Sequence, residues 1–135
     1  MKIKKDIITA IIAHAKKDAP IEACGYLASQ NGVVVKHYEL NNIDQSPEHF
    51  SFDQKDQFDV LRDTRAKGLK ITGVYHSHPQ SPARPSDEDI RLAYDPTYSY
   101  VIVSTAGESA DVKSFQIKNS KVELQEIEVI NDADL

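Results

Sequence analysis

The chain has 135 residues, of which 16 are basic and 21 acidic, so its formal charge is −5, and 40% of the residues are apolar. A chain of this length is expected to form one domain, over residues 1–135, with a real hydrophobic core. The composition excludes collagen-like, low-complexity and wholly disordered chains. The negative charge and the lack of a basic stripe argue against nucleic acid as a partner, because phosphate binding needs clustered Lys and Arg.

Cys24 is the single cysteine of the chain. One thiol can form neither an internal disulfide nor a cysteine-rich zinc site, so we expect a cytoplasmic protein. For Cys24 itself we favour the role of a small buried side chain, with a redox thiol close to a metal as the alternative.

The N-terminal segment has two interpretations. A basic start, an apolar run over residues 7–13 and the triplet Ala13-His14-Ala15 resemble a secretory signal. The isoleucines, however, recur at the spacing of one helical face and charged residues fill the other positions, which predicts an amphipathic helix that stops near Pro20. No apolar run reaches the roughly 18 residues that a membrane span needs, so we expect no membrane contact.

The next segments alternate between strand and helix patterns. Residues 23–29 are expected to form a short buried strand, and Asn31-Gly32 predicts a hairpin into a strand over residues 33–35. Residues 41–47 are typical of a loop, and residues 50–52 are compatible with a short strand. A polar surface helix is expected from about residue 53 to 67, with Gly68 as its end.

The second half begins with a predicted strand over residues 70–78 and a proline-rich loop over residues 79–85. A short helix is expected to start at Ser86, and residues 100–104 predict a central strand buried on both faces. Two more strands are expected over residues 112–117 and 122–130, with a bulge or bend where the apolar parity changes. Together these elements predict an α/β or α+β fold with one mixed sheet and helices packed on it.

The residues with the clearest chemistry are two histidines and an aspartate. Side chains alternate along a strand, so His76 and His78 should point the same way, roughly 7 Å apart at their Cα atoms. The proline-rich loop can return the chain so that Asp89, in the first turn of the next helix, faces both imidazoles. Two histidines and one carboxylate leave a fourth tetrahedral position open, which is typical of a catalytic zinc site.

Simpler interpretations exist for some of these residues. Ser86-x-x-Asp89 is also a capping box, in which both side chains satisfy backbone donors at a helix start. We expect both functions at once, with the cap fixing the direction of Asp89. The remaining histidines, His14, His37 and His49, have no comparable context and are expected to be ordinary surface or boundary residues.

The spacing H-S-H-P-x(6)-S-x-x-D, with an upstream E-x-C-G and a G-x-Y before the histidines, resembles the JAMM (MPN+) family of zinc metalloproteases. The similarity runs over nearly the whole chain. It implies a single MPN/JAMM domain with a cytidine-deaminase-like mixed sheet flanked by helices. It also implies hydrolysis of amide and isopeptide bonds next to ubiquitin or ubiquitin-like proteins.

The resemblance also implies a role for each motif residue. His76, His78 and Asp89 would bind one zinc ion per chain, and Glu22 would be the acid beside the metal-bound water. The Ser86 hydroxyl would bind the tetrahedral intermediate. Arg84, in the loop beside the proposed metal, is either a substrate contact or a solvated loop residue.

The compact length resembles the small prokaryotic members of the family. These are associated with sulfur-carrier proteins that end in Gly-Gly, and such a tail could add a strand to a sheet edge beside the zinc. Two alternatives are a non-catalytic metal-binding MPN scaffold and a cupin-type metal enzyme. The cupin pattern requires a Glu four or five residues after the second histidine, where this chain has Pro82 and Ala83. The oligomeric state is not indicated by the sequence.

Overall fold

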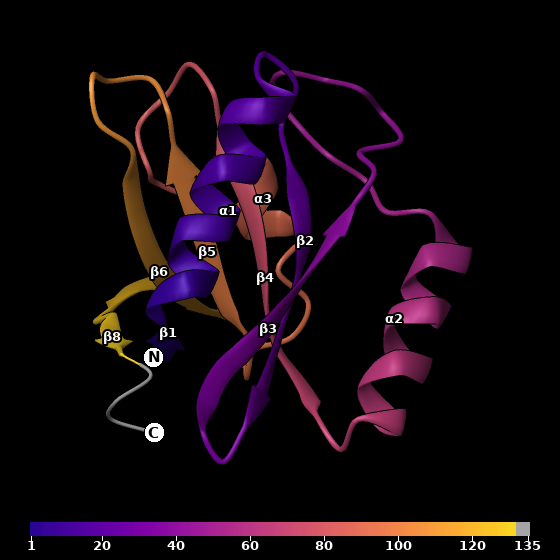
Figure 1. Cartoon of the computed structure of the whole chain (residues 1–135). Helices are drawn as coiled ribbons and strands as arrows, with labels where there is room; N and C mark the ends of the chain where they lie inside the picture. Colours follow the sequence, from indigo (N-terminus) through magenta and orange to yellow (C-terminus); the bar gives the residue numbers. More distant parts are fainter. Residues whose placement is uncertain (132–135) are drawn as a thin grey trace.

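The computed structural model describes residues 1–131. This part of the chain contains three helices and a sheet, and the sheet is curled (Figure 1). One domain over residues 1–135 stays a prediction, and its last four residues lie outside the described ones. The helices and strands are β1 (Lys2–Lys4), α1 (Lys5–Asp18), β2 (Cys24–Gln30), β3 (Val33–Leu40), α2 (Gln54–Ala66), β4 (Lys70–His78), α3 (Asp87–Arg91), β5 (Ser99–Ser104), β6 (Asp111–Lys118), β7 (Lys121–Gln125) and β8 (Glu128–Ile130).

All strands join one sheet in the order β7-β6-β5-β4-β2-β3-β1-β8. β4 is parallel to β5, and β1 is parallel to both β3 and β8, whereas the other neighbours are antiparallel. β7 and β8 are the edge strands, yet only residues 126–127 separate them in the chain, so the sheet curls until its two ends approach each other (Figure 1). The predicted fold class, a mixed sheet with helices against it, is confirmed.

Helix α1 covers one face of the sheet (Figure 1). Its residues Ile7, Ile11 and Ala15 are buried and share a core cluster with Leu27 and Val101. Each fully buried aliphatic side chain of the isoleucine size contributes roughly 1.5–3 kcal/mol. The N-terminal isoleucines therefore belong to a folded amphipathic helix, as their spacing predicts. Among the described residues, no helix has both the length and the apolar character needed to cross a bilayer.

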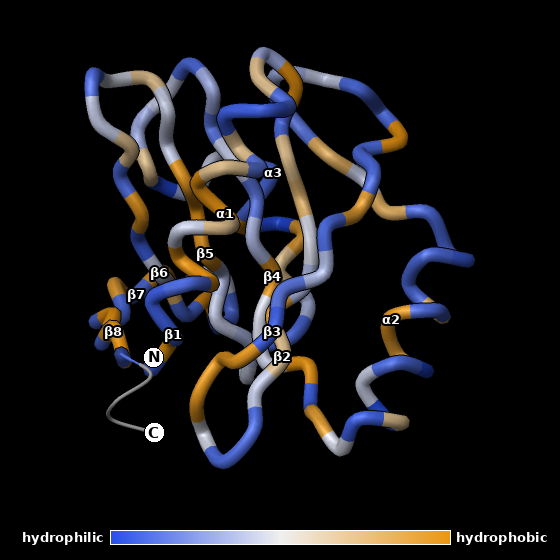
Figure 2. The backbone as a smooth tube through the Cα atoms, in the orientation of Figure 1, coloured by the Kyte–Doolittle hydropathy of each residue, from blue (hydrophilic) through white to orange (hydrophobic). Residues whose placement is uncertain are grey.

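The opposite face carries α3 and a second, smaller core. Buried Ala83, Ile102, Phe115 and Ile117 form this cluster, and Ile90 from α3 packs against it. Helix α2 is largely polar along its length, as Figure 2 shows, and buries only Val60 and Thr64. It is the surface helix that the sequence predicts.

The hairpin between β2 and β3 has its turn where the sequence places it. Asn31 and Gly32 have φ angles of 52° and 80°, the left-handed values that a two-residue hairpin turn needs. β3 does not stop at residue 35, however, but continues to Leu40, which pairs with Cys24. Pairing with β2 extends the strand through polar residues that show no strand pattern of their own.

Residues 50–52 form no strand, so that prediction is wrong. Phe50 and Phe52 are instead part of a loop and contact each other, with ring centroids 5.4 Å apart. Contacts between half-buried aromatic rings, and not a neighbouring strand, explain why apolar residues recur here.

The single strand expected over residues 122–130 is two strands. β7 pairs with β6, whereas β8 pairs with β1 at the other end of the sheet order. The sequence predicts a bulge or bend in this segment; at residues 126–127 the strand instead ends, and a new strand begins at Glu128. β1 was not predicted, because three residues are too few to show an alternating pattern.

Candidate active site

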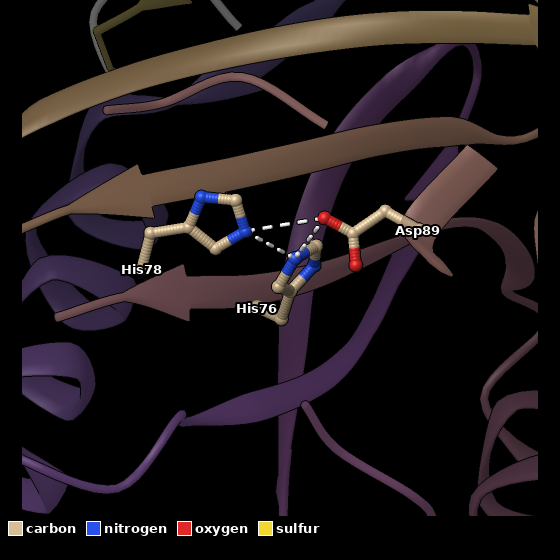
Figure 3. Close-up of side chains that lie close together, drawn as sticks. All are labelled: His76, His78 and Asp89. Carbon is tan, nitrogen blue, oxygen red and sulfur yellow. Dashed lines mark hydrogen bonds and ion pairs between the residues drawn. The ribbon is translucent and has the colours of Figure 1, made fainter. Parts of the chain in front are cut away.

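Strand β4 brings two histidines together inside the sheet. His76 and His78 are both 5% exposed and lie on the same face, as strand alternation predicts. Their Nε2 atoms are 3.1 Å apart (Figure 3). Two imidazole nitrogens therefore converge on one point.

The sheet leaves no free edge at these histidines within the described residues. Cys24 on β2 and Ile102 on β5 flank His76 from the two sides, and the edge strands are β7 and β8. At His76 strand β4 is therefore flanked on both sides, and strand addition by a substrate tail at a sheet edge beside the metal stays a prediction.

Helix α3 supplies the third group. Ser86 is its N-cap and forms a complete capping box with Asp89: the Asp89 amide donates to Ser86 Oγ at 3.0 Å, and the Ser86 amide donates to Asp89 Oδ2 at 2.9 Å. The same Oδ2 atom lies 3.1 Å from the Nε2 atoms of His76 and His78 (Figure 3). The cap thus orients the carboxylate toward the imidazoles, as we expected.

The proline-rich loop orients one imidazole. His78 Nδ1 lies 2.8 Å from the Pro82 carbonyl oxygen. A carbonyl only accepts, so Nδ1 carries the hydrogen and donates it. This leaves the lone pair of Nε2 directed at the other two groups, the arrangement that a metal-binding histidine needs.

The local charges favour an ionised aspartate. Burial by itself would raise the pKa of Asp89, but hydrogen bonds with His76 and His78 outweigh it and lower that pKa strongly. Burial likewise opposes the charged form of His78, yet hydrogen bonds to Asp89 and to Pro82 raise its pKa overall. The pocket therefore stabilises a positive charge next to the carboxylate.

The donor set fits a metal ion. The ligand atoms of His76, His78 and Asp89 all lie within 4.8 Å of one another. Two imidazole nitrogens and one carboxylate oxygen suit zinc and leave a coordination position open. A bound cation would replace the hydrogen bonds that join Asp89 to the two imidazoles.

Glu22 lies two residues before β2, close enough to this cluster for the charges of His78 and Asp89 to affect its pKa. It is 3% exposed, and its Oε1 atom has no hydrogen-bond partner. Burial raises the pKa of Glu22 to about 8; the charge of His78 opposes the rise and that of Asp89 adds to it. A buried carboxylic acid without a partner is costly and fits a group that exchanges protons with a ligand.

The other predicted residues are placed less tightly. Ser86 is exposed, and its Oγ accepts the cap hydrogen bond. Arg84 is exposed in the loop before α3, so its contact with substrate stays a prediction. Cys24 is fully buried, and burial raises the pKa of its thiol to about 12, which supports a packing role over a redox role.

An aromatic cavity beside the metal ligands was not predicted. Its volume is about 390 Å³, and it includes His76 and Asp89 in its wall. The Phe50 ring stacks on the His76 ring, with centroids 4.7 Å apart. The rest of the apolar wall comprises Tyr26, Phe52, Val74, Pro85, Leu92, Tyr94, Tyr98, Tyr100, Ile102 and Ile117. Phe50 and Phe52 are an apolar pair in a polar stretch, which was the available signal for this wall.

The remaining histidines lie elsewhere. His37 and His49 each pair with a carboxylate, Glu39 and Asp44 respectively. His14 is 4% exposed, so the expectation of a surface or boundary position is wrong for it. Its helical face is buried against the sheet, where Nδ1 hydrogen-bonds with the Tyr75 hydroxyl and Nε2 lies 3.0 Å from Asp18 Oδ2.

A mixed sheet carrying an open two-histidine, one-aspartate cluster next to a buried glutamate defines a metal-dependent hydrolase. Residues 4–118 match the family described as prokaryotic homologs of the JAB domain. The chain belongs to this family, which confirms the resemblance to the small prokaryotic JAMM/MPN metalloproteases. The cupin alternative is wrong, because the histidine pair leads into a helix of a different fold.

Known relatives support this assignment. The chain is 33% identical over 131 residues to the CysO-cysteine peptidase of Mycobacterium tuberculosis, covering 95% of this chain and 90% of the relative. It is 30% identical over 114 residues to the desampylase of Haloferax volcanii, covering 79% and 82%. The solution structure of a Desulfitobacterium hafniense protein superposes with a TM-score of 0.88 at 43% identity, covering 97% of this chain and 93% of that one. The chain is accordingly a JAMM-type peptidase.

Proposed function

We propose that the protein is a zinc-dependent peptidase that cleaves an amide or isopeptide bond at the C-terminal Gly-Gly tail of a ubiquitin-like or sulfur-carrier protein. His76, His78 and Asp89 would hold one zinc ion per chain. The observation that carries the proposal is the open three-ligand cluster beside the unpaired Glu22 carboxylic acid. The relatives named as CysO-cysteine peptidase and desampylase support the kind of substrate.

Zinc in this cluster would acidify a water molecule and polarise the scissile carbonyl. In our proposal Glu22 takes the proton of the attacking water and passes it to the leaving amine. Burial raises the pKa of Glu22, whereas a cation at the histidines would lower it, so the carboxyl group could both accept and release a proton near neutral pH. Burial keeps bulk water from competing for that proton.

Ser86 would assist at the oxyanion. Its Oγ accepts the Asp89 amide hydrogen, so the hydroxyl hydrogen stays available as a donor. By analogy with oxyanion-hole donors of other hydrolases, a hydroxyl aimed at the developing charge could contribute about 3–4 kcal/mol. The capping box would thus orient a metal ligand and an oxyanion donor from the same helix start.

The substrate tail would cross the face of the sheet along the aromatic cavity. Glycine allows close backbone approach to the histidines, because it has no side chain. The cavity, of about 390 Å³, offers room on the His76 side for the group next to the scissile bond. We also propose a cytoplasmic location, in keeping with a single, buried thiol.

The decisive experiment incubates the zinc-loaded protein with conjugates of Gly-Gly-terminated carriers and follows release of the carrier by mass spectrometry. Wild type should cleave, and a chelator should stop cleavage. Glu22→Gln should keep its zinc but lose about 10²–10⁴-fold in rate. The matched control is Glu123→Gln on edge strand β7, which should cleave like wild type.

Unchanged cleavage in Glu22→Gln or after chelation would refute the mechanism. The scaffold alternative is tested by melting with and without chelator, because a structural metal shifts stability strongly and a catalytic one much less. A large loss of stability without any cleavage would favour the scaffold.

A further inference from the structure

The backbone of Glu22 is held by a loop far away in sequence. Its amide donates to the Ser46 carbonyl at 2.9 Å, and its carbonyl accepts from Asn42 Nδ2 at 3.1 Å. Glu22 itself lies outside any strand, because β2 begins at Cys24. These bonds therefore replace strand pairing at this residue.

The Glu22 side chain has no such support. Among the described residues no hydrogen bond reaches Oε1. The position of the carboxyl group is consequently set by its backbone anchors and by packing. Loosening an anchor moves the acid relative to the histidines.

Asn42 bonds further points of the same loop. The side chain, in a residue 8% exposed, donates through Nδ2 to the His49 carbonyl at 2.9 Å. Its Oδ1 accepts the amides of Asp44 at 3.1 Å and Ser51 at 3.3 Å. His49 and Ser51 flank Phe50, whose ring stacks on His76 and lines the aromatic cavity. One amide thus ties the cavity wall to the peptide of Glu22.

We propose that Asn42 is a positioning residue that holds Glu22 and the Phe50 wall of the cavity as one unit. The proposal rests on the catalytic role proposed for Glu22. The reason is geometric: Nδ2 donates to a carbonyl of each segment, Glu22 and His49, while Oδ1 accepts two amides of the loop, and this takes a side chain with both a donor and an acceptor. The neighbouring Asn41 is exposed and has no such bonds.

Asn42→Asp is the sharpest variant, because it preserves shape and removes the donors. A carboxylate oxygen would then face the carbonyl oxygens of Glu22 and His49, which repels the loop from the base. Asn41→Asp adds the same charge one residue away, at an exposed position, and is the matched control.

The kinetic test measures kcat and KM of Asn42→Asp and Asn41→Asp. Each substitution is made in two backgrounds, the wild-type protein and Glu22→Gln. Asn42→Asp should lower kcat at least about tenfold through Glu22 and raise KM through the cavity wall, with zinc content unchanged. In the Glu22→Gln background its effect on kcat should disappear, because the base it positions is absent. An equal loss of kcat in both backgrounds would overturn the proposal, since general destabilisation acts in either.

A second measurement needs no activity. Hydrogen exchange of the Glu22 and Ser51 amides should accelerate at least about tenfold in Asn42→Asp and stay unchanged in Asn41→Asp, while β5 amides keep their protection. Unchanged exchange at Glu22 overturns the proposal.

If wild type cleaves no conjugate, the proposed function fails and exchange alone decides the role of Asn42. If Asn42→Asp does not fold, Asn42→Ser, whose short hydroxyl cannot bridge both segments, takes its place in each measurement.

Discussion

Each face of the sheet at β4 carries a cluster of polar side chains that includes buried histidine, and the two clusters differ in how their polar atoms are satisfied. On the α1 face, His14 Nδ1 lies 2.8 Å from the Tyr75 hydroxyl and His14 Nε2 lies 3.0 Å from Asp18 Oδ2. Both ring nitrogens have protein partners. This cluster is closed and serves to join α1 to the sheet.

On the α3 face, the corresponding atoms point at one another. The Nε2 atoms of His76 and His78 share the single oxygen Oδ2 of Asp89, and Glu22 Oε1 nearby has no partner. The unpaired Oε1 atom of Glu22 costs stability unless a ligand binds it. The difference teaches that the site is recognised by three ligand atoms converging beside an unpaired carboxyl oxygen, and not by the presence of histidine alone.

The largest expected effect comes from neutralising one carboxylate on each face of the sheet. Asp89→Asn preserves an oxygen for the cap but removes the charge, so zinc content should fall from one per chain toward zero and kcat/KM by more than about 100-fold. Asp18→Asn makes the same change on the α1 face and should keep zinc and activity. Metal analysis of both purified variants checks this; loss of zinc in Asp18→Asn would remove the distinction between the faces.

The next effect concerns the pH dependence of stability in the zinc-free protein. The pKa of Glu22 is raised to about 8 in the folded state, against 4.5 as its ordinary value. Between these values the folded state binds the extra proton, so the destabilisation due to Glu22 is absent below about pH 4.5 and grows until about pH 8. Glu22→Gln should therefore stabilise the zinc-free protein by a few kcal/mol at pH 8 and hardly at pH 4.5.

Urea denaturation of both proteins at the two pH values measures this difference, because all other titrating groups are shared. An equal difference at both pH values would show that the Glu22 acid is not desolvated. The same variant should lose cleavage, so stability and activity should change in opposite directions.

A smaller effect is expected for the His14 cluster on the α1 face. Tyr75→Phe removes the hydroxyl that His14 Nδ1 contacts and leaves a buried nitrogen unpaired, which should cost about 1–3 kcal/mol of unfolding free energy. Zinc content and kcat should stay at wild-type values, because Tyr75 faces away from the metal ligands. Chemical denaturation together with metal analysis tests both halves of the prediction.

The smallest expected effect is at Cys24. Its burial and its raised pKa, about 12, predict that iodoacetamide does not modify the native protein at pH 8 within hours. The urea-unfolded protein should react fully, which is the control. If Cys24 were modified as fast in the folded protein as in the unfolded one, the interpretation of Cys24 as a redox thiol would be favoured again.

The sequence by itself determined the local elements and the ligand set. Isoleucine spacing defined α1, Asn31-Gly32 defined the hairpin, and the spacing of His76, His78 and Asp89 with the Ser86 cap was enough to expect three converging side chains. These features depend on backbone periodicity and short loops, which act over a few residues. Glu22 came from resemblance alone, because no local pattern separates it from a solvated acid.

Only the tertiary structure decided the rest. It divided the last predicted strand between two edges of the curled sheet, and it made the 50–52 segment a cavity wall in place of a strand. It also buried His14 and joined Asn42 to Glu22 across 20 residues of chain. These outcomes depend on which distant segments share buried space and hydrogen-bond partners, and no pattern within one segment encodes that choice.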